Sequence, residues 1–224
     1  IKNPLTPIQL ATERLKRRYR KQVETEDGEL FDELTSTIVR QVGDLRKMVD
    51  EFSSFARLPK PVFRSEDPVD LVRQAVFLQE VAHPGIHFGM RTEDLGSREM
   101  LCDRHQLGQA MTNVLKNAVE AVEARAAEAE DDYAGEVRVT MEGDDAEIAI
   151  TVEDNGVGLP TDRDRITEPY MTTREKGTGL GLAIVNKIVD EHGGDMSFAA
   201  GKGGGTRVTL RFARNPQILA GEAK

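Results

Sequence analysis

Two glycine-rich clusters hold the residues whose types and spacing are best suited to chemistry. The first is Asp154-Asn155-Gly156-Val157-Gly158, and the second, about twenty residues later, is Gly177-Thr178-Gly179-Leu180-Gly181-Leu182-Ala183. Glycines let a backbone approach a ligand closely and adopt positive φ angles. The Asp154 carboxylate can accept a hydrogen bond from an exocyclic amine such as that of adenine. Together the clusters favour a nucleotide site over two ordinary glycine turns that flank a loop.

Two secondary-structure elements must position these clusters. Residues 146–153 alternate apolar and polar side chains and predict a strand, and residues 182–189 have the period of an amphipathic helix. A helix that begins just after Gly179 points free N–H groups and the positive end of its dipole at an anion. The spacing fits neither a Walker A loop, which needs Gly-Lys-Ser/Thr, nor a Rossmann GxGxxG motif.

A further candidate lies on a long helix predicted upstream, in the segment Asn113-Val114-Leu115-Lys116-Asn117-Ala118. Asn113 and Asn117 are four residues apart and share one helix face, although Asn has a low helix propensity. Amide oxygens can ligate Mg²⁺, and Lys116 could reach a phosphate. The alternative is a pair of solvated amides beside a surface lysine. The position upstream of the glycine clusters favours a metal face.

Composition excludes several classes of protein. The 224 residues suit one or two domains, and a net charge of −9 makes a nucleic-acid backbone an improbable partner. One cysteine, Cys102, permits no internal disulfide and fits a reducing compartment. No apolar run approaches the ~20 residues of a membrane span. The chain begins with Ile1 inside a helical pattern, so we expect a piece of a longer protein.

The region 1–58 predicts two helices separated by a polar break at residues 24–28. The second helix, from about Glu29 to Arg57, carries an apolar seam whose members step by fours and threes: Ile38, Val42, Leu45, Val49, Phe52 and Ala56. This heptad pattern is typical of a bundle helix, and two copies of the hairpin can bury it as a four-helix bundle. We therefore expect a homodimer. The alternative is that the seam packs on the second domain.

Residues 59–63 read as a linker, residues 64–214 as a second domain, and residues 215–224 as a tail. The second domain predicts helices from Asp67 to about Val81 and from Asp103 to about Ala129, the latter opened by a capping box of Asp103 and Gln106. Its predicted strands are residues 86–91, 136–141, 146–152, 196–199 and 207–212. The pattern predicts a mixed sheet with helices on one face, an α/β sandwich.

Four ordered motifs resemble the nucleotide-binding boxes of sensor histidine kinases. Residues 113–118, 154–158, 177–182 and 203–206 look like the N, G1, G2 and G3 boxes, and residues 166–173 resemble the F box, with Tyr170 replacing the usual Phe. The opening residues 1–7 look like the stretch just after the phospho-accepting histidine, which would precede Ile1. Residues 3–9 with Glu13-Arg14 are most similar to the nitrogen-regulation branch of the family.

The resemblance implies an α+β architecture, in which a helical-hairpin dimerisation bundle precedes an α/β-sandwich ATP-binding domain of the Bergerat (GHKL) type. It implies protein-histidine kinase activity, with ATP and Mg²⁺ as cofactors. The γ-phosphoryl group would pass to a histidine and then to an Asp of a response regulator receiver domain. It also implies a cytoplasmic piece of a protein anchored in the bacterial inner membrane. Without the histidine, this chain should lack autokinase activity but keep regulator phosphatase activity.

The resemblance assigns roles residue by residue. Asn113 and Asn117 would lie on the Mg²⁺ and phosphate side, and Asp154, Gly156, Gly158 and Thr206 on the adenine side. The phosphate end would be formed by Gly177, Thr178, Gly179, Leu180, Gly181 and Leu182.

The polar loop from about Leu159 to Lys176, which is long for a compact domain, predicts a mobile lid that contains Tyr170. Two further roles follow from the same resemblance. Within the loop, Arg174 and Lys176 would be the candidates for the γ-phosphate. Asn3 would hold the water of the phosphatase reaction, or would only cap the first helix.

Two rival classes share parts of this pattern. ATPases of the gyrase, Hsp90 and MutL types resemble the second domain but place a Glu, which activates water, where this chain has Asn113. A non-catalytic dimeric scaffold would bind nucleotide only as a signal. The four histidines, His83, His87, His105 and His192, are expected at the surface or at helix ends, and Cys102 is expected to be buried.

Overall fold

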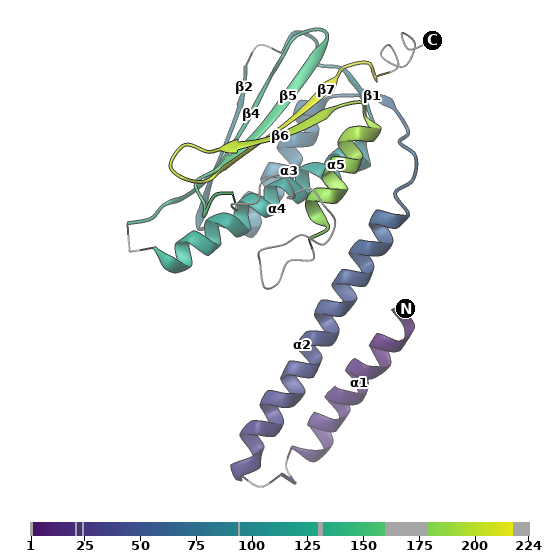
Figure 1. Ribbon diagram of the computed structural model, residues 1–224, viewed down its shortest axis with the longest axis vertical. Coiled ribbons are helices and arrows are strands. Elements are labelled where there is room, and N and C mark those ends of the chain that lie inside the picture. The colour runs from purple at the N-terminus through teal and green to yellow at the C-terminus, as the bar shows by residue number, and fades with distance from the viewer. Residues whose placement is uncertain are drawn as a thin grey trace. The chain divides into compact units, whose positions relative to one another are not determined.

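The computed structural model describes residues 2–20, 22–23, 25–93, 95–129, 132–159 and 179–216. The chain divides into two units (Figure 1). One is built on residues 2–58 and the other on the described residues from Pro59 onward.

The first unit is a helical hairpin of α1 (Lys2–Tyr19) and α2 (Thr25–Ala56) (Figure 1). Leu5 and Thr12 on α1 and Thr35 and Val42 on α2 are buried. Lys16 donates from Nζ to Ser36 Oγ at 3.0 Å, which links the two helices. The expected break at residues 24–28 is wrong, because α2 already begins at Thr25.

The hairpin leaves much of its apolar surface exposed. Two helices offer each other only one stripe each, so the other apolar side chains of both helices have no cover within a single hairpin. Side chains between 41% and 55% exposed are Ile8, Leu10, Leu15, Tyr19, Leu30, Leu34, Ile38, Leu45, Met48 and Phe52. Three of these, Ile38, Leu45 and Phe52, belong to the predicted seam.

The second unit contains a five-stranded sheet of order β2-β4-β5-β7-β6. Its strands are β2 (Ile86–Thr92), β4 (Gly135–Gly143), β5 (Glu147–Asp154), β6 (Asp195–Ala200) and β7 (Thr206–Ala213). Only β2 and β4 pair in parallel, and the other neighbours are antiparallel.

Three helices cover one face of this sheet: α3 (Pro68–Ala82), α4 (Arg104–Glu128) and α5 (Gly181–Glu191) (Figure 1). Alternate residues of β4 and β5, including Val137, Val139, Ile150 and Val152, are buried, as the period of a half-covered strand requires. The predicted α/β sandwich is confirmed. No described helix is both long enough and apolar enough to cross a bilayer.

A second, two-stranded sheet was not predicted. It pairs β1 (Arg64–Glu66) with β3 (Met100–Cys102) in antiparallel register. Each strand has three residues, which is too short for an alternation of apolar and polar side chains to be recognised. The buried Arg214 side chain lies beside this sheet and donates to the carbonyl oxygens of Leu95 and Glu99.

The capping box predicted at the start of α4 is half right. Asp103 caps the helix, since its Oδ1 accepts from the backbone N–H groups of His105 and Gln106 at 2.9 and 3.1 Å. The second half of the capping box is wrong, because the Gln106 amide donates to the carbonyl of Pro59 instead. The Asp103 N–H donates to Nε2 of His192 at 3.0 Å.

His192 lies at the end of α5, as expected, but it is not a surface histidine. Its side chain is 1% exposed, and its ring lies edge-on to Phe63 and Phe212 at centroid distances of 5.2 and 6.2 Å. Its Nδ1 donates to the carbonyl of Ile188 at 2.8 Å, which leaves Nε2 as the acceptor. The ring joins the end of α5 to the start of α4.

Candidate nucleotide site

One stripe of α4 organises the candidate site. Asn113, Asn117, Ala121 and Arg125 follow one another at steps of four residues, so each lies about 40° further round the helix than the one before and the four form a slanting stripe. Each member contacts or approaches a glycine-containing segment. The stripe thereby connects the start of α5 at one end with the turns beside β5 and β7 at the other.

The asparagine end of the stripe lies at the start of α5. Asn113 Nδ2 is 3.4 Å from the carbonyl oxygen of Gly181, the first residue of α5. A Cβ atom on Gly181 would be 4.0 Å from Asn117 Nδ2. Gly179 has φ +68°, a conformation that favours glycine. The two amides thus lie beside the N-terminal end of α5, where the positive end of the helix dipole is suited to an anion.

Lys116 directly precedes Asn117 on α4 but is not a member of this stripe. Its side chain is exposed, with Nζ 3.8 Å from Glu120 Oε1 one turn later. This loose surface pair is too weak to fix the lysine in place.

Asp154 ends β5 and is 5% exposed. Its Oδ1 accepts from the backbone N–H of Gly156 at 2.8 Å and from that of Thr206, the first residue of β7, at 3.2 Å. Such bonds fix the orientation of a buried carboxylate. The structure therefore brings together two predicted adenine-side residues that are far apart in sequence.

Close backbone approach explains the glycines of the first cluster. A Cβ atom on Gly156 would be 2.4 Å from the carbonyl carbon of Ala121, and the Val157 N–H donates to the oxygen of that carbonyl at 3.1 Å. A Cβ atom on Gly158, at φ +81°, would be 2.6 Å from the carbonyl oxygen of Gly204. The turn at 154–158 thus packs closely against both α4 and the β6–β7 turn.

Two residues that the sequence analysis missed complete this end of the site. Arg125 Nη1 is 2.7 Å from the carbonyl oxygen of Asn155 and 2.7 Å from that of Gly203. The Arg125 guanidinium lies 5.1 Å from the ring centroid of Tyr133, whose hydroxyl is 2.9 Å from Asn155 Oδ1. Burial raises the pKa of Tyr133, so this hydroxyl stays a donor. The four-residue step from Asn113 and Asn117 was the signal that could have indicated Arg125.

The described residues contain no cluster of three or more His, Cys, Asp or Glu side chains that could hold a metal ion. The amide oxygens of Asn113 and Asn117 could each supply one ligand to a metal ion, together with oxygens from a bound nucleotide. Such a sparse protein contribution suits Mg²⁺, which usually shares its sphere with phosphates and water.

Several predicted residues lie outside the described part of the chain: Tyr170, Arg174, Lys176, Gly177 and Thr178. Asn3 lies in α1, but its side chain is not described. Leu180 is fully buried and Leu182 is half-buried.

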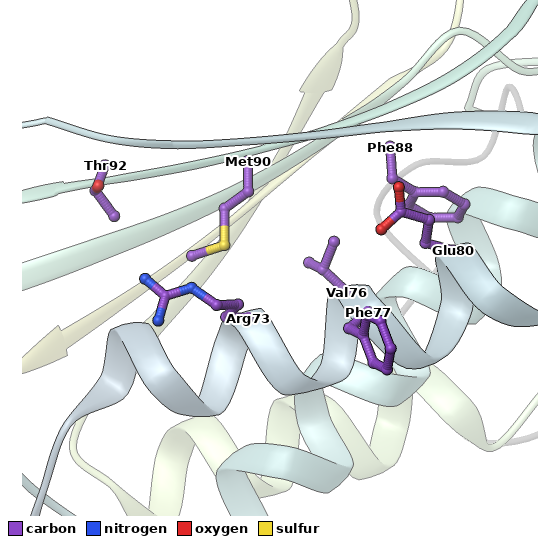
Figure 2. Close-up of a pocket in the computed structure, with 7 residues that line it drawn as sticks. All are labelled: Arg73, Val76, Phe77, Glu80, Phe88, Met90 and Thr92. Atoms are coloured by element: carbon purple, nitrogen blue, oxygen red, sulfur yellow. The ribbon is translucent and has the colours of Figure 1, made fainter.

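A separate hollow of about 290 Å³ lies between α3 and the edge strand β2. Figure 2 shows Arg73 and Glu80 toward its two ends, with Met90 and Phe88 on the strand side. Its lining residues are Arg73, Val76, Phe77, Glu80, Phe88, Met90 and Thr92. None of them is a predicted site residue, so the hollow does not belong to the candidate nucleotide site.

Two protein families match the sequence of this chain. Residues 102–216 match the histidine kinase-, DNA gyrase B-, and HSP90-like ATPase family, and residues 1–61 match the His Kinase A (phospho-acceptor) domain. The chain belongs to the sensor histidine kinase family. The family predicted from the sequence and its fold class are thereby confirmed.

Named relatives agree with this assignment. The nitrogen regulation protein NtrY of Azorhizobium caulinodans is 51% identical over 215 residues, which cover 94% of this chain and 27% of the relative. A putative sensor histidine kinase, NtrY-like, of Rickettsia bellii is 38% identical over 95% of this chain and 33% of the relative. This chain thus spans about a quarter to a third of the length of these curated relatives.

A solved structure shares the architecture of the second unit. The catalytic domain of the histidine kinase ThkA is 26% identical, with a TM-score of 0.60, over 70% of this chain and 98% of that domain.

Proposed function

We propose that this chain is the ATP-binding and phosphotransfer core of a two-component sensor kinase. It would bind ATP with Mg²⁺ and pass the γ-phosphoryl group to a histidine and then to an Asp of a response regulator. The observation that carries the proposal is the shared stripe of α4, which joins two amides at a helix start to a buried carboxylate held by Thr206.

Each end of the stripe has its own task. Asp154 accepts from the adenine amine, while Gly156 and Gly158 let the backbone close around the ring. The start of α5, from Gly179 to Leu182, faces the phosphates with its N–H groups. Asn113 and Asn117 would hold Mg²⁺, which neutralises phosphate charge when bound.

Asn113 favours a kinase over a hydrolase. An amide cannot take a proton from water, so this side chain cannot act as the general base of an ATPase. An imidazole is already a nucleophile and needs no such base. We also propose that four further side chains contact the nucleotide: Lys116, Tyr170, Arg174 and Lys176. Gly177 and Thr178 would complete the phosphate loop.

The partners are part of the proposal. The seam of α2, in which Ile38, Leu45 and Phe52 are exposed, supports a homodimer that buries these side chains in a four-helix bundle. The regulator would carry an NtrX-like receiver domain, given the identity to NtrY. The whole protein would be anchored in the inner membrane, with residues 1–58, 59–63, 64–214 and 215–224 as bundle, linker, ATP-binding domain and tail.

Phosphotransfer to a supplied substrate tests this function. The chain is mixed with labelled ATP·Mg²⁺ and the histidine-containing hairpin of the Azorhizobium caulinodans NtrY. A kinase core should leave acid-labile phosphate on that hairpin and release little free phosphate. Free phosphate without labelled hairpin would indicate a hydrolytic ATPase instead. Nucleotide binding with neither product would indicate a scaffold.

Regulator phosphatase activity needs a separate test, because it depends on Asn3 rather than on ATP hydrolysis. A phosphorylated NtrX-like receiver is incubated with the chain or with its Asn3→Ala variant. Decay should be faster with the unchanged chain. Equal decay rates would remove Asn3 from the mechanism.

A further inference from the structure

We propose that Arg125 is a positioning residue for adenine recognition, which acts by tying the 154–158 turn to the β6–β7 turn. The inference rests on the proposed function, because it assumes that Asp154 receives the adenine amine. Arg125 would not touch the nucleotide. It would hold in position the residues that do contact the nucleotide.

Several close contacts join the two turns, including the approach of Gly201 and Gly205 to the Asp154 carbonyl oxygen, and Arg125 supplies a further link with a single atom. Its Nη1 carries two hydrogens and lies 2.7 Å from both the Asn155 and the Gly203 carbonyl oxygens. These carbonyls belong to segments 48 residues apart (203 − 155). The neighbouring links are the approach of Gly158 to Gly204 and the bond from the Thr206 N–H to Asp154.

The tie acts next to the recognition pair. Asn155 directly follows Asp154, and Gly203 lies three residues before Thr206. Gly203 and Gly204 have φ angles of +87° and +99°, so this turn consists of residues with much conformational freedom. Fixing the Gly203 carbonyl therefore limits where the Thr206 N–H can point, and with it the orientation of the Asp154 carboxylate.

Arg125 is itself held in place on two sides. Its backbone belongs to the last turns of α4, and its guanidinium packs at 5.1 Å from the Tyr133 ring centroid. Tyr133 is in turn bonded to Asn155, whose side chain also bonds the backbone of Ala134 and Glu136. A preorganised planar cation loses little freedom when it bridges two carbonyls, whereas a lysine ammonium is a flexible point charge.

The discriminating probe is inosine triphosphate, which carries an oxygen acceptor where adenine carries its amine donor, so this exocyclic position cannot donate to Asp154. The affinities of the full chain for ATP·Mg²⁺ and ITP·Mg²⁺ are compared by calorimetry, for the unchanged chain, Arg125→Lys and Arg125→Met. Arg104→Lys is the matched control, because Arg104 lies at the other end of α4 and bonds Glu66.

The unchanged chain should prefer ATP to ITP by about tenfold or more. Arg125→Lys should weaken ATP binding by about three- to tenfold, Arg125→Met by at least as much, and neither should change ITP binding. The ATP-to-ITP preference should therefore shrink, while the control keeps it. Amide exchange at Thr206 should become faster in both Arg125 variants.

Three results would overturn the inference. An equal loss of ATP and ITP affinity would mean that Arg125 contributes only to the stability of the folded state. In that case thermal unfolding would show that the variants are also less stable. An unchanged preference in Arg125→Lys and Arg125→Met would mean that the tie does not position Asp154. ATP binding without preference over ITP in the unchanged chain would remove Asp154 from recognition but leave the proposed function intact, whereas absent ATP binding would remove both.

Discussion

The Asp154 carboxylate and the Thr206 N–H, 52 residues apart in sequence, are joined by a hydrogen bond of 3.2 Å in a buried setting. The bond links the end of β5 to the start of β7. The same carboxylate oxygen also accepts from the Gly156 N–H at 2.8 Å, so two backbone donors orient the side chain proposed for the adenine amine.

Asp154→Asn should weaken ATP binding by roughly ten- to a hundredfold, the equivalent of about 1.5–3 kcal/mol for a hydrogen bond to a charged acceptor. The variant amide can keep its oxygen toward Thr206, but its NH₂ group would then face the adenine amine, donor against donor. Calorimetric titration measures the loss. Glu153→Gln is the control, since Glu153 pairs with Arg207 and should leave affinity unchanged. Equal affinities for Asp154→Asn and the unchanged chain would refute the assignment.

Gly156→Ala and Gly108→Ala should have opposite effects on stability. A Cβ atom on Gly156 would meet the Ala121 backbone at 2.4 Å, so the turn must move and ATP binding should fall with stability. Gly108 lies inside α4 with open space around it, so alanine should stabilise the helix by about 0.5–1 kcal/mol. Denaturant unfolding measures both. A neutral Gly156→Ala variant would contradict the close approach of the two backbones.

The stability of the second unit should fall as the pH drops below about 6.5. Burial lowers the pKa of the His192 imidazole below its ordinary value of 6.5, against the opposing charges of Asp103 and Glu191. Between the lowered and the ordinary pKa the unfolded chain binds more protons than the folded chain, so acid favours unfolding. A protonated ring would also turn a second donor toward the Asp103 N–H. The full loss is reached below the lowered pKa.

Thermal unfolding at pH 7.5 and pH 5.5 measures this effect. The carboxylates Asp103 and Glu153 have lowered pKa values and titrate below this window. His192→Gln should be less stable at pH 7.5 but should show a flatter pH dependence. The same slope in both proteins would show that another group is responsible.

Cys102 should be unreactive in the folded chain. Burial raises the pKa of its thiol to about 12, and the thiolate is the reactive form. A disulfide reagent at pH 8 should modify it only after denaturant is added. A cysteine placed at the exposed Thr112 is the positive control. Rapid labelling of native Cys102 would contradict its burial.

The sequence was informative where one segment carries a repeating pattern. The amphipathic helices and the two long hairpins follow from the spacing of apolar residues, and the glycine clusters follow from their unusual density. It was not informative where a residue's role depends on a distant partner. His192 contacts Asp103 and Phe63, and Arg125 contacts Gly203, only because the fold brings these distant segments together. Strands β1 and β3 were not predicted because a strand of three residues is too short to show an alternation of apolar and polar side chains.

The exposed seam of α2 has a thermodynamic consequence. A hairpin that buries these side chains only against a second copy obeys mass action, so its melting temperature should rise with protein concentration. The second unit has its own buried core of apolar side chains, and its transition should not depend on dilution. Calorimetric scans over a hundredfold range of concentration should therefore separate the chain into one transition that moves and one that does not.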